Sequence, residues 1–147
     1  MEGERYVLAV DGIVLRVSMV YEHNYSGRKI TFLHMVKDAV SSRRVVKIAS
    51  DQFMTPTYVL DIPVAIHALL ENDATGIFHL GTIQRTSRFD FALNVSKLLG
   101  LDSSYIQPIS MNEDPFYSDK PRDTSFNLQK ISKYIHLRTI EQTLSVD

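Results

Sequence analysis

Two residues of this sequence have the spacing of a catalytic pair. Tyr25 and Lys29 form a Tyr-x-x-x-Lys sequence, with which enzymes place a proton-donating tyrosine and the lysine that lowers its pKa on one helix face. Ser26 and Gly27 lie between them and disfavour the helix that this convergence requires. Seven Tyr and seven Lys among 147 residues also make an accidental match unsurprising. We therefore interpret the pair as accidental.

A second set of polar residues lies at the ends of the strands that the sequence predicts. Its members are Ser18, Tyr21, Asp51, Gln52, Thr55, Thr57 and residues 85–88. In an open parallel α/β sheet, ligands bind outside the carboxyl ends of the strands, where we expect these side chains. The same residue types also form turns and helix caps, a role that suits Asp51, Thr57 and Ser87. From the residues alone, both interpretations stay open.

The sequence lacks the other common motifs of cofactor, metal and nucleophile chemistry. Its six glycines include no dinucleotide-binding spacing. Gly76 and Gly81 have the spacing of a phosphate-binding loop, but Thr82 stands where that loop requires lysine. The five histidines are scattered, there is no cysteine, and no Gly-x-Ser-x-Gly occurs. We therefore predict no metal site and no nucleophile.

The composition is that of a soluble globular domain. Of the 147 residues, 44% are hydrophobic and 22% are charged, and the net charge is -1. This balance argues against nucleic acid as a partner, and no apolar run approaches the roughly 18 residues of a membrane span. The acidic N-terminal residues do not resemble the basic start of a secretory signal. With no cysteine in the chain, we expect one domain in the cytoplasm.

Strands and helices alternate along the chain in our prediction. We expect helices over residues 2–10, 32–40, 61–70, 87–99 and 128–135. We expect strands over residues 13–21, 45–49, 77–80 and 105–109, with loops over 51–57 and 111–125. Asp61 is expected to cap the third helix, and Ser87 with Asp90 to form the capping box of the fourth. This alternation predicts an α/β fold.

The expected strand over residues 13–21 has a nearly continuous β-branched and apolar sequence, IVLRVSMVY. Such a run is typical of a strand that is covered on both faces in a parallel sheet. A strand of this kind needs a neighbouring strand on each side. The helix expected before it, over residues 2–10, also lacks a recognisable N-terminal start signal. We therefore expect a homo-oligomer, or a partner chain that covers the open sheet edge.

Several segments, taken in order, resemble one family. They are GERYVL (3–8), LRVSMVY (15–21), FL (32–33), DQFMTPT (51–57), DIPVAI (61–66), GIFHL (76–80), SRFDFA (87–92) and PRDTS (121–125). Together they resemble the C-terminal portion of the dTDP-4-dehydrorhamnose reductase family, which belongs to the extended short-chain dehydrogenase/reductases. The resemblance covers nearly the whole chain, and the DQ…PT element is its most specific part.

The resemblance implies a Rossmann-like fold, of which this chain would supply the last parallel strands and a small substrate-binding lobe. In the family, a dinucleotide-binding half with the cofactor fingerprint and the Tyr-x-x-x-Lys pair comes first. We therefore expect residues 1–147 to form a single substrate-binding domain that lacks this N-terminal half. The complete family uses NADP or NAD, and we expect this chain alone to bind neither.

The resemblance also implies roles for five residues of this chain. Ser18 would lie near both the nicotinamide and the sugar, and Met19 beside it. Asp51 and Gln52 would lie near the sugar cleft, and Arg122 near the nucleotide end of the substrate. No catalytic residue and no metal ligand is expected.

Four differences from the family pattern predict an altered sugar site. Met19 replaces a common Trp, Glu22 and Met54 each replace a Gly, and Lys120-Pro121 replaces Arg-Pro. The same C-terminal pattern also resembles the regulatory beta subunit of methionine adenosyltransferase, a partner-binding relative. Fold resemblance alone does not separate these uses.

Our hypothesis is that the chain is the sugar-nucleotide-binding portion of an NAD(P)H-dependent keto-sugar reductase. We expect it to be inactive alone, because the cofactor fingerprint and the proton donor are missing. The alternative is a non-catalytic regulatory or interaction subunit.

Overall fold

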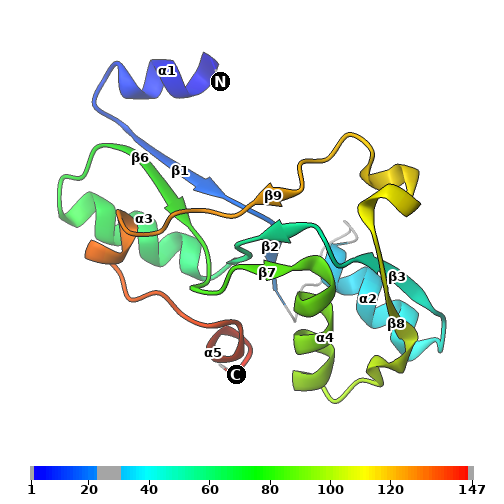
Figure 1. Ribbon diagram of the computed structural model, residues 1–147. Coiled ribbons are helices and arrows are strands. Elements are labelled where there is room, and N and C mark those ends of the chain that lie inside the picture. The colour runs from blue at the N-terminus through cyan, green and yellow to red at the C-terminus, as the bar shows by residue number, and fades with distance from the viewer. Residues whose placement is uncertain (1, 23–30, 146–147) are drawn as a thin grey trace.

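The computed structural model describes residues 2–22 and 31–145. Its helices are α1 (Glu2–Leu8), α2 (Phe32–Ser41), α3 (Asp61–Glu71), α4 (Arg88–Leu98) and α5 (Ile140–Leu144). Its strands are β1 (Ile13–Val17), β2 (Val20–Tyr21), β3 (Val46–Ala49), β4 (Phe53–Met54), β5 (Thr57–Tyr58), β6 (Gly76–Leu80), β7 (Thr86–Ser87), β8 (Ile106–Ile109) and β9 (Asp123–Thr124). The predicted α/β class is confirmed (Figure 1).

Four small sheets hold the fold together, and their pairings are mostly parallel. Strand β1 pairs with β6, β2 with β5, and β3 with β8, all in parallel. Strand β4 pairs in parallel with β9 and antiparallel with β7. Parallel partners need a crossover connection, and the one between β1 and β6 is long, running through β2, α2, β3, β4 and β5 before α3 leads into β6.

The long strand predicted over residues 13–21 is interrupted. Strand β1 ends at Val17 and β2 begins at Val20, so Ser18 and Met19 form a bend between them. Met19 has a φ of 29°, in the left-handed region that a side chain with a Cβ adopts only at a cost. The apolar sequence continues across this bend, which is why its hydrophobic pattern predicts one strand.

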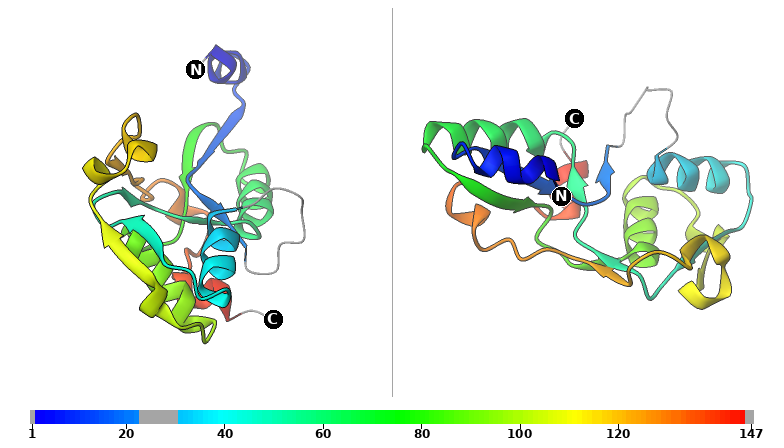
Figure 2. Two further views of the ribbon diagram at one scale, coloured as in Figure 1. Left: turned by 90° about the vertical axis from the view of Figure 1, so that its right-hand side faces the viewer. Right: turned by 90° about the horizontal axis from the view of Figure 1, so that it is seen from above.

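The predicted burial of β1 on both faces is wrong for the described residues. Ile13 and Leu15 pack against the core beneath α3, but they are only half-buried, and Val17 is 39% exposed. Within the described part of the chain, β6 is the only strand that pairs with β1. Helix α1 buries none of its residues and stands apart from the body in the left view of Figure 2.

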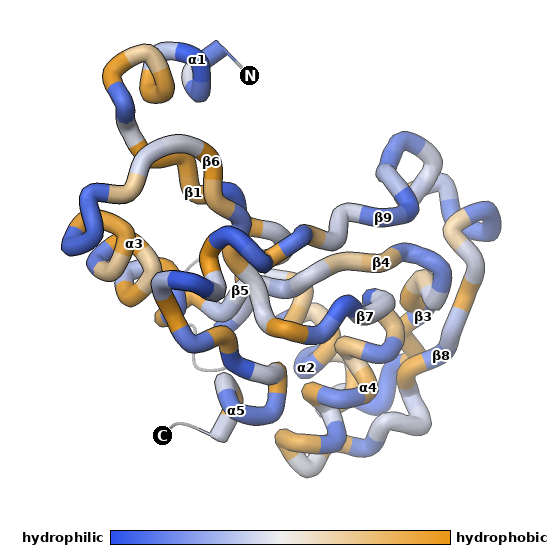
Figure 3. The backbone as a smooth tube through the Cα atoms, turned by 60° about the vertical axis from the view of Figure 1, so that its left-hand side comes forward, coloured by the Kyte–Doolittle hydropathy of each residue, from blue (hydrophilic) through white to orange (hydrophobic). Residues whose placement is uncertain are grey.

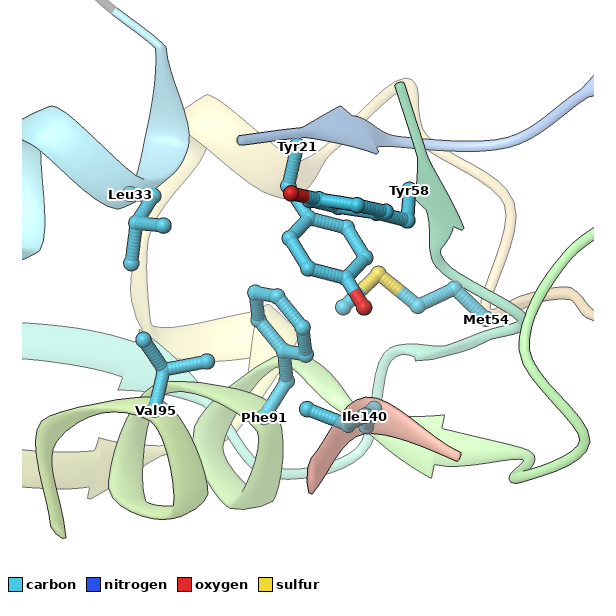
Figure 4. Close-up of a cluster of buried hydrophobic side chains, with 7 residues drawn as sticks. All are labelled: Tyr21, Leu33, Met54, Tyr58, Phe91, Val95 and Ile140. Carbon is cyan, nitrogen blue, oxygen red and sulfur yellow. The ribbon is translucent and has the colours of Figure 1, made fainter. Parts of the chain in front are cut away.

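An aromatic cluster forms the centre of the molecule. Its buried members are Tyr21, Leu33, Met54, Tyr58, Phe91, Val95 and Ile140 (Figure 4). They come from β2, β4, β5 and helices α2, α4 and α5, so one cluster joins segments from both ends of the chain. Tyr21 Oη lies 2.5 Å from Thr143 Oγ1, a buried hydrogen bond that attaches α5 to β2.

Two helix starts differ in how well the sequence predicts them. Ser87 caps α4 as expected, because its Oγ accepts a hydrogen bond from the backbone N–H of Asp90. The predicted capping box is not complete, since the Asp90 carboxylate accepts from the Ser87 hydroxyl and not from its backbone N–H. Asp61 does not cap α3: it is the first helical residue, Leu60 precedes it without a side-chain cap, and the Asp61 carboxylate pairs with Arg138. Because the Asp61 carboxylate forms this ion pair with Arg138, it does not act as the N-cap of α3.

The C-terminal third departs most from our prediction. The expected loop over residues 111–125 contains two 3-10 turns, Met111–Glu113 and Pro115–Tyr117, and strand β9. The expected helix over 128–135 is only a 3-10 turn, Ile131–Lys133, and α5 was not predicted. The expected loop over 51–57 contains β4 and the first residue of β5. Within the described residues, no helix combines the length and apolar character needed to cross a membrane.

Candidate functional site

A cavity of about 470 Å³ lies where β1 ends. It is lined by Val17, Ser18, Met19, Gln52, Met54, Arg88, Lys120, Pro121, Thr124 and Phe126. We call it the polar cavity. Most of its lining comes from the end of β1 and the bend after it, and from the segment that carries β9. Figure 1 shows these elements. The carboxyl end of a parallel strand is where open α/β sheets bind ligands.

The bend at Ser18 and Met19 is held by Thr57. The Thr57 hydroxyl accepts a hydrogen bond from the backbone N–H of Ser18, at 3.1 Å, and donates one to the carbonyl of Leu80, at 2.8 Å. Gly81 follows directly, and a Cβ there would lie 2.7 Å from Thr55 Cγ2, so only glycine fits this crossing. These contacts fix the backbone that presents Ser18 and Met19 to the cavity.

Gln52 reaches the polar cavity from the segment after β3. It is only 5% exposed, and its Nε2 donates a hydrogen bond to the carbonyl of Pro121, at 3.1 Å. Its Oε1 is buried without a hydrogen-bond partner among the described residues. A buried acceptor of this kind is costly unless something donates to it, so Gln52 is suited to a ligand hydroxyl.

Asp51 and Arg122 lie together, outside the polar cavity. The Asp51 carboxylate accepts hydrogen bonds from the backbone N–H of Met111, from Ser110 Oγ and from Arg122 Nη1, each at 2.8 Å. These hydrogen bonds, the one from Met111 foremost, lower the pKa of Asp51. Arg122 also donates to Asn112 Oδ1. Asp51 thereby anchors the turn after β8.

Arg122 lines a separate cavity of about 560 Å³. The rest of this loop cavity is lined by Met111, Asn112, Glu113, Asp114, Pro115, Tyr117, Ser118 and Lys120. Lys120 lines this cavity as well as the polar cavity, and its Nζ donates a hydrogen bond to the carbonyl of Phe116. The five residues named by the resemblance are therefore divided: Ser18, Met19 and Gln52 line the polar cavity, and Arg122 lines the loop cavity. Asp51 lines neither cavity and is hydrogen-bonded to Arg122.

Arg88 is a lining residue that the resemblance did not single out. It is the first residue of α4, and its Nε is buried without a hydrogen-bond partner among the described residues. Burial lowers the pKa of its guanidinium group. The sequence placed Arg88 within the polar set at residues 85–88 without singling it out. The signal that distinguishes it is its missing partner, which only the structure reveals.

The described residues do not fit a dinucleotide. The turns that lead from β5 into α3 and from β7 into α4 contain no glycine, whereas a pyrophosphate cradle needs a glycine-rich turn of this kind. Within residues 2–22 and 31–145, no three His, Asp or Glu side chains are grouped to hold a metal ion. The Tyr25 and Lys29 pair lies outside the described residues.

Comparison with known proteins identifies related sequences. The family model described as the RmlD substrate binding domain matches residues 1–146. The chain is 28% identical over 126 residues to a dTDP-4-keto-6-deoxy-D-glucose reductase of Streptomyces niveus, covering 83% of this chain and 42% of the relative. It is 26% identical to a dTDP-4-dehydrorhamnose reductase of Mycolicibacterium smegmatis, covering 88% and 40%. The chain thus spans about two fifths of the length of these relatives.

Solved structures share the fold. A dTDP-4-dehydrorhamnose reductase of Clostridium acetobutylicum superposes with a TM-score of 0.83 at 22% identity, covering 97% of this chain and 50% of that one. One from Bacillus anthracis, in complex with NADP, superposes with a TM-score of 0.77 at 20% identity, covering 90% and 46%. The Rossmann-like fold class is therefore confirmed. The chain covers about half of each of these two solved structures.

Proposed function

The chain belongs to the family of RmlD substrate-binding domains, and we propose that it is the sugar-nucleotide-binding portion of an NAD(P)H-dependent keto-sugar reductase. The observation that carries this proposal is the polar cavity at the end of β1, where Ser18, Met19 and Gln52 converge. The relatives named as reductases of dTDP-linked sugars support the substrate class.

We further propose how these residues contact the substrate. Gln52 Oε1 accepts a hydrogen bond from a sugar hydroxyl, which supplies the donor that this buried oxygen lacks. Ser18 and Met19 face the reacting end of the sugar, where a nicotinamide would lie in the complete enzyme. Arg122 binds toward the nucleotide end, and Asp51 acts through it by holding its guanidinium.

We propose that the chain has no reductase activity by itself. Reduction of a keto group needs a hydride and a proton, and the described residues fit no dinucleotide. NAD(P)H supplies the hydride when it is bound, and the cradle that would hold it has no counterpart in residues 2–22 and 31–145. Loss of a general acid alone costs about 100- to 10,000-fold in rate.

The experiment measures binding and turnover separately. Isothermal titration of the full 147-residue chain with dTDP and with UDP tests nucleotide binding, and absorbance at the NADPH band tests turnover of dTDP-4-keto-6-deoxymannose. We expect dTDP to bind and NADPH to remain unoxidised. Turnover by the chain alone would overturn the proposed inactivity, and failure of both nucleotides to bind would overturn the nucleotide-sugar proposal.

A second candidate function is that of a non-catalytic interaction subunit. It is favoured by an exposed apolar surface around a cavity of about 600 Å³ between β1 and α3, lined in part by Ile13, Leu15, Ile66 and Leu70. Figure 3 shows the apolar stretches of β1 and β6 beside α3. Either a second copy or a partner chain would cover the β1 edge. Sedimentation tests this second function, because a chain that is monomeric at every concentration, alone or with dTDP, would contradict self-association through this surface.

A further inference from the structure

Arg88 differs from five other described arginines in having no carboxylate partner among the described residues. Five described arginines pair with a carboxylate, in the pairs Arg16–Glu4, Arg44–Asp38, Arg85–Asp123, Arg122–Asp51 and Arg138–Asp61. The guanidinium carbon of Arg88 instead lies 5.1 Å from the ring centroid of Phe32, and its Nε has no hydrogen-bond partner among the described residues. Arg88 therefore carries a positive charge that the described residues leave uncompensated.

An uncompensated charge in a largely buried position costs stability. Water cannot solvate the buried Nε of Arg88, and burial lowers the pKa of the group because it disfavours the charged form. A methionine or leucine would fill the same space without this cost. The presence of arginine at position 88 is explained if an anion that binds to the protein supplies the missing partner of its guanidinium group.

Arg88 lies between two cavities of different character. On one side is the polar cavity, which it lines with Ser18 and Gln52. On the other is a cavity of about 540 Å³ that it shares with Phe32, Met35, Phe116 and Tyr117, among others. We call this second space the aromatic cavity. Arg88 is the one described residue that the linings of these two cavities share.

The neighbouring charges leave room for an anion at Arg88. Asp114 also lines the aromatic cavity, but its Oδ1 accepts a hydrogen bond from the backbone N–H of Phe116, at 2.9 Å. Lys120 lines the polar cavity and adds a second positive charge, with its Nζ 3.7 Å from the Phe116 ring centroid. Two cations therefore line the polar cavity, and Arg88 alone of the two also lines the aromatic one.

We propose that Arg88 binds the phosphate of a nucleotide, with the sugar in the polar cavity and the base in the aromatic cavity. Arg122 then lies toward the same nucleotide end, in the loop cavity that shares Asp114 and Tyr117 with the aromatic cavity. This inference rests on the proposed function and assigns an orientation to the ligand. A planar guanidinium forms paired hydrogen bonds to phosphate oxygens, and aromatic walls suit the flat face of a base.

The test compares Arg88→Met with Arg44→Met in the full chain. Methionine keeps the apolar stem of Arg88 and removes its charge, while Arg44 is an exposed arginine paired with Asp38 on α2 and serves as the control. Each protein is titrated with dTDP, inorganic pyrophosphate and thymidine. We expect Arg88→Met to weaken dTDP and pyrophosphate roughly tenfold or more and thymidine less than about threefold. The control should bind all three as wild type does.

A second measurement separates binding from a structural role. Because the charge is unpaired, Arg88→Met should keep or raise the melting temperature of the free chain while reducing the increase that dTDP causes. A fall in the melting temperature with equal losses for dTDP and thymidine would overturn the proposal, because Arg88 would then only support the fold.

The remaining outcomes separate this inference from the proposed function. If wild type and Arg88→Met bind dTDP equally, the role of Arg88 is wrong and the nucleotide-sugar function stands. If wild type binds pyrophosphate through Arg88 but no dTDP, the anion site stands and the nucleotide-sugar function is wrong. If wild type binds none of the three probes, both are wrong.

Discussion

At the scale of single residues, neighbours in sequence have different roles. Asp51 and Gln52 are adjacent, yet Gln52 reaches the polar cavity and Asp51 holds the turn after β8. The chain bends at Asp51, and only Gln52 of this polar pair lines the cavity. The sequence predicted that this pair lies at the end of a strand, but not which member faces the cavity.

Asp51 should stabilise the fold in a pH-dependent way. Asp51→Asn weakens hydrogen bonds from Met111, Ser110 and Arg122, and we expect it to lower the free energy of unfolding by about 1 kcal/mol or more at pH 7. The folded state lowers the pKa of Asp51, so this stabilisation is complete above the ordinary aspartate range and is lost as pH falls through the folded pKa.

Urea unfolding at pH 7 and at about pH 3 checks this expectation, because the difference between wild type and Asp51→Asn should shrink at the lower pH. Asp38→Asn is the control, since Asp38 is 69% exposed in its pair with Arg44 and should cost under about 0.5 kcal/mol. A difference that stays constant with pH would contradict the assignment.

Thr57 should be important for the bend that presents Ser18. Thr57→Val removes the hydroxyl that bonds the Ser18 N–H and the Leu80 carbonyl, leaving two buried backbone groups without that partner. We expect a loss of about 2 kcal/mol in unfolding free energy. Thr57→Ser keeps the hydroxyl and should lose less. Chemical denaturation of the two variants measures the difference, and a loss for Thr57→Ser equal to that for Thr57→Val would contradict the leading role of the hydroxyl.

At the scale of elements, the sequence predicts what local signals specify. Ser87 before an apolar periodic run predicts α4 correctly, because a cap and a hydrophobic face act within the helix itself. The two-residue strands β4, β7 and β9 have no such signal, since their pairing partners lie far along the chain. Helix α5 did have a local sequence signal, because Thr139 and Gln142 form a capping box, but the helix itself is only five residues long.

Helix α5 should contribute to stability through one residue. Ile140 is fully buried in the aromatic cluster, so Ile140→Ala should lower the free energy of unfolding by about 2 to 5 kcal/mol. Leu144→Ala, at a partly buried position on the same helix, should cost less. Thermal and urea unfolding measure both. Equal costs would mean that α5 packs through its whole length instead of through Ile140.

At the scale of the whole molecule, the exposed apolar surface is the main departure from a self-contained domain. Ile66 is 43% exposed and Leu70 is 62% exposed on α3, beside a β1 edge that no described strand covers. Large apolar surfaces of this kind mark contacts with other chains. The sequence predicted an uncovered strand edge from the pattern of residues 13–21, but the part played by α3 depends on which of its faces packs inward.

Replacing this surface should reduce association. The double variant Ile66→Gln and Leu70→Gln should sediment as a smaller species than wild type at the same concentration, with little change in helix content, because glutamine is a good helix former. Val45→Gln, at a position that is 54% exposed outside this surface, is the control. A wild-type chain that is monomeric at every concentration and binds no apolar dye would remove the basis for the prediction.

The pairing of the strands has a consequence for how the chain acquires its fold. Ile13 pairs with Gly76, Val46 with Ile106 and Phe53 with Asp123, and no two consecutive described strands form a hairpin. Each pairing requires the closure of a long loop, which costs conformational entropy before the contacts between the strands form. Folding should therefore be slow for a chain of this size. During synthesis, β1 leaves the ribosome before its partner β6, so its apolar residues stay exposed until β6 has been synthesised. That interval is when a chaperone would be needed most.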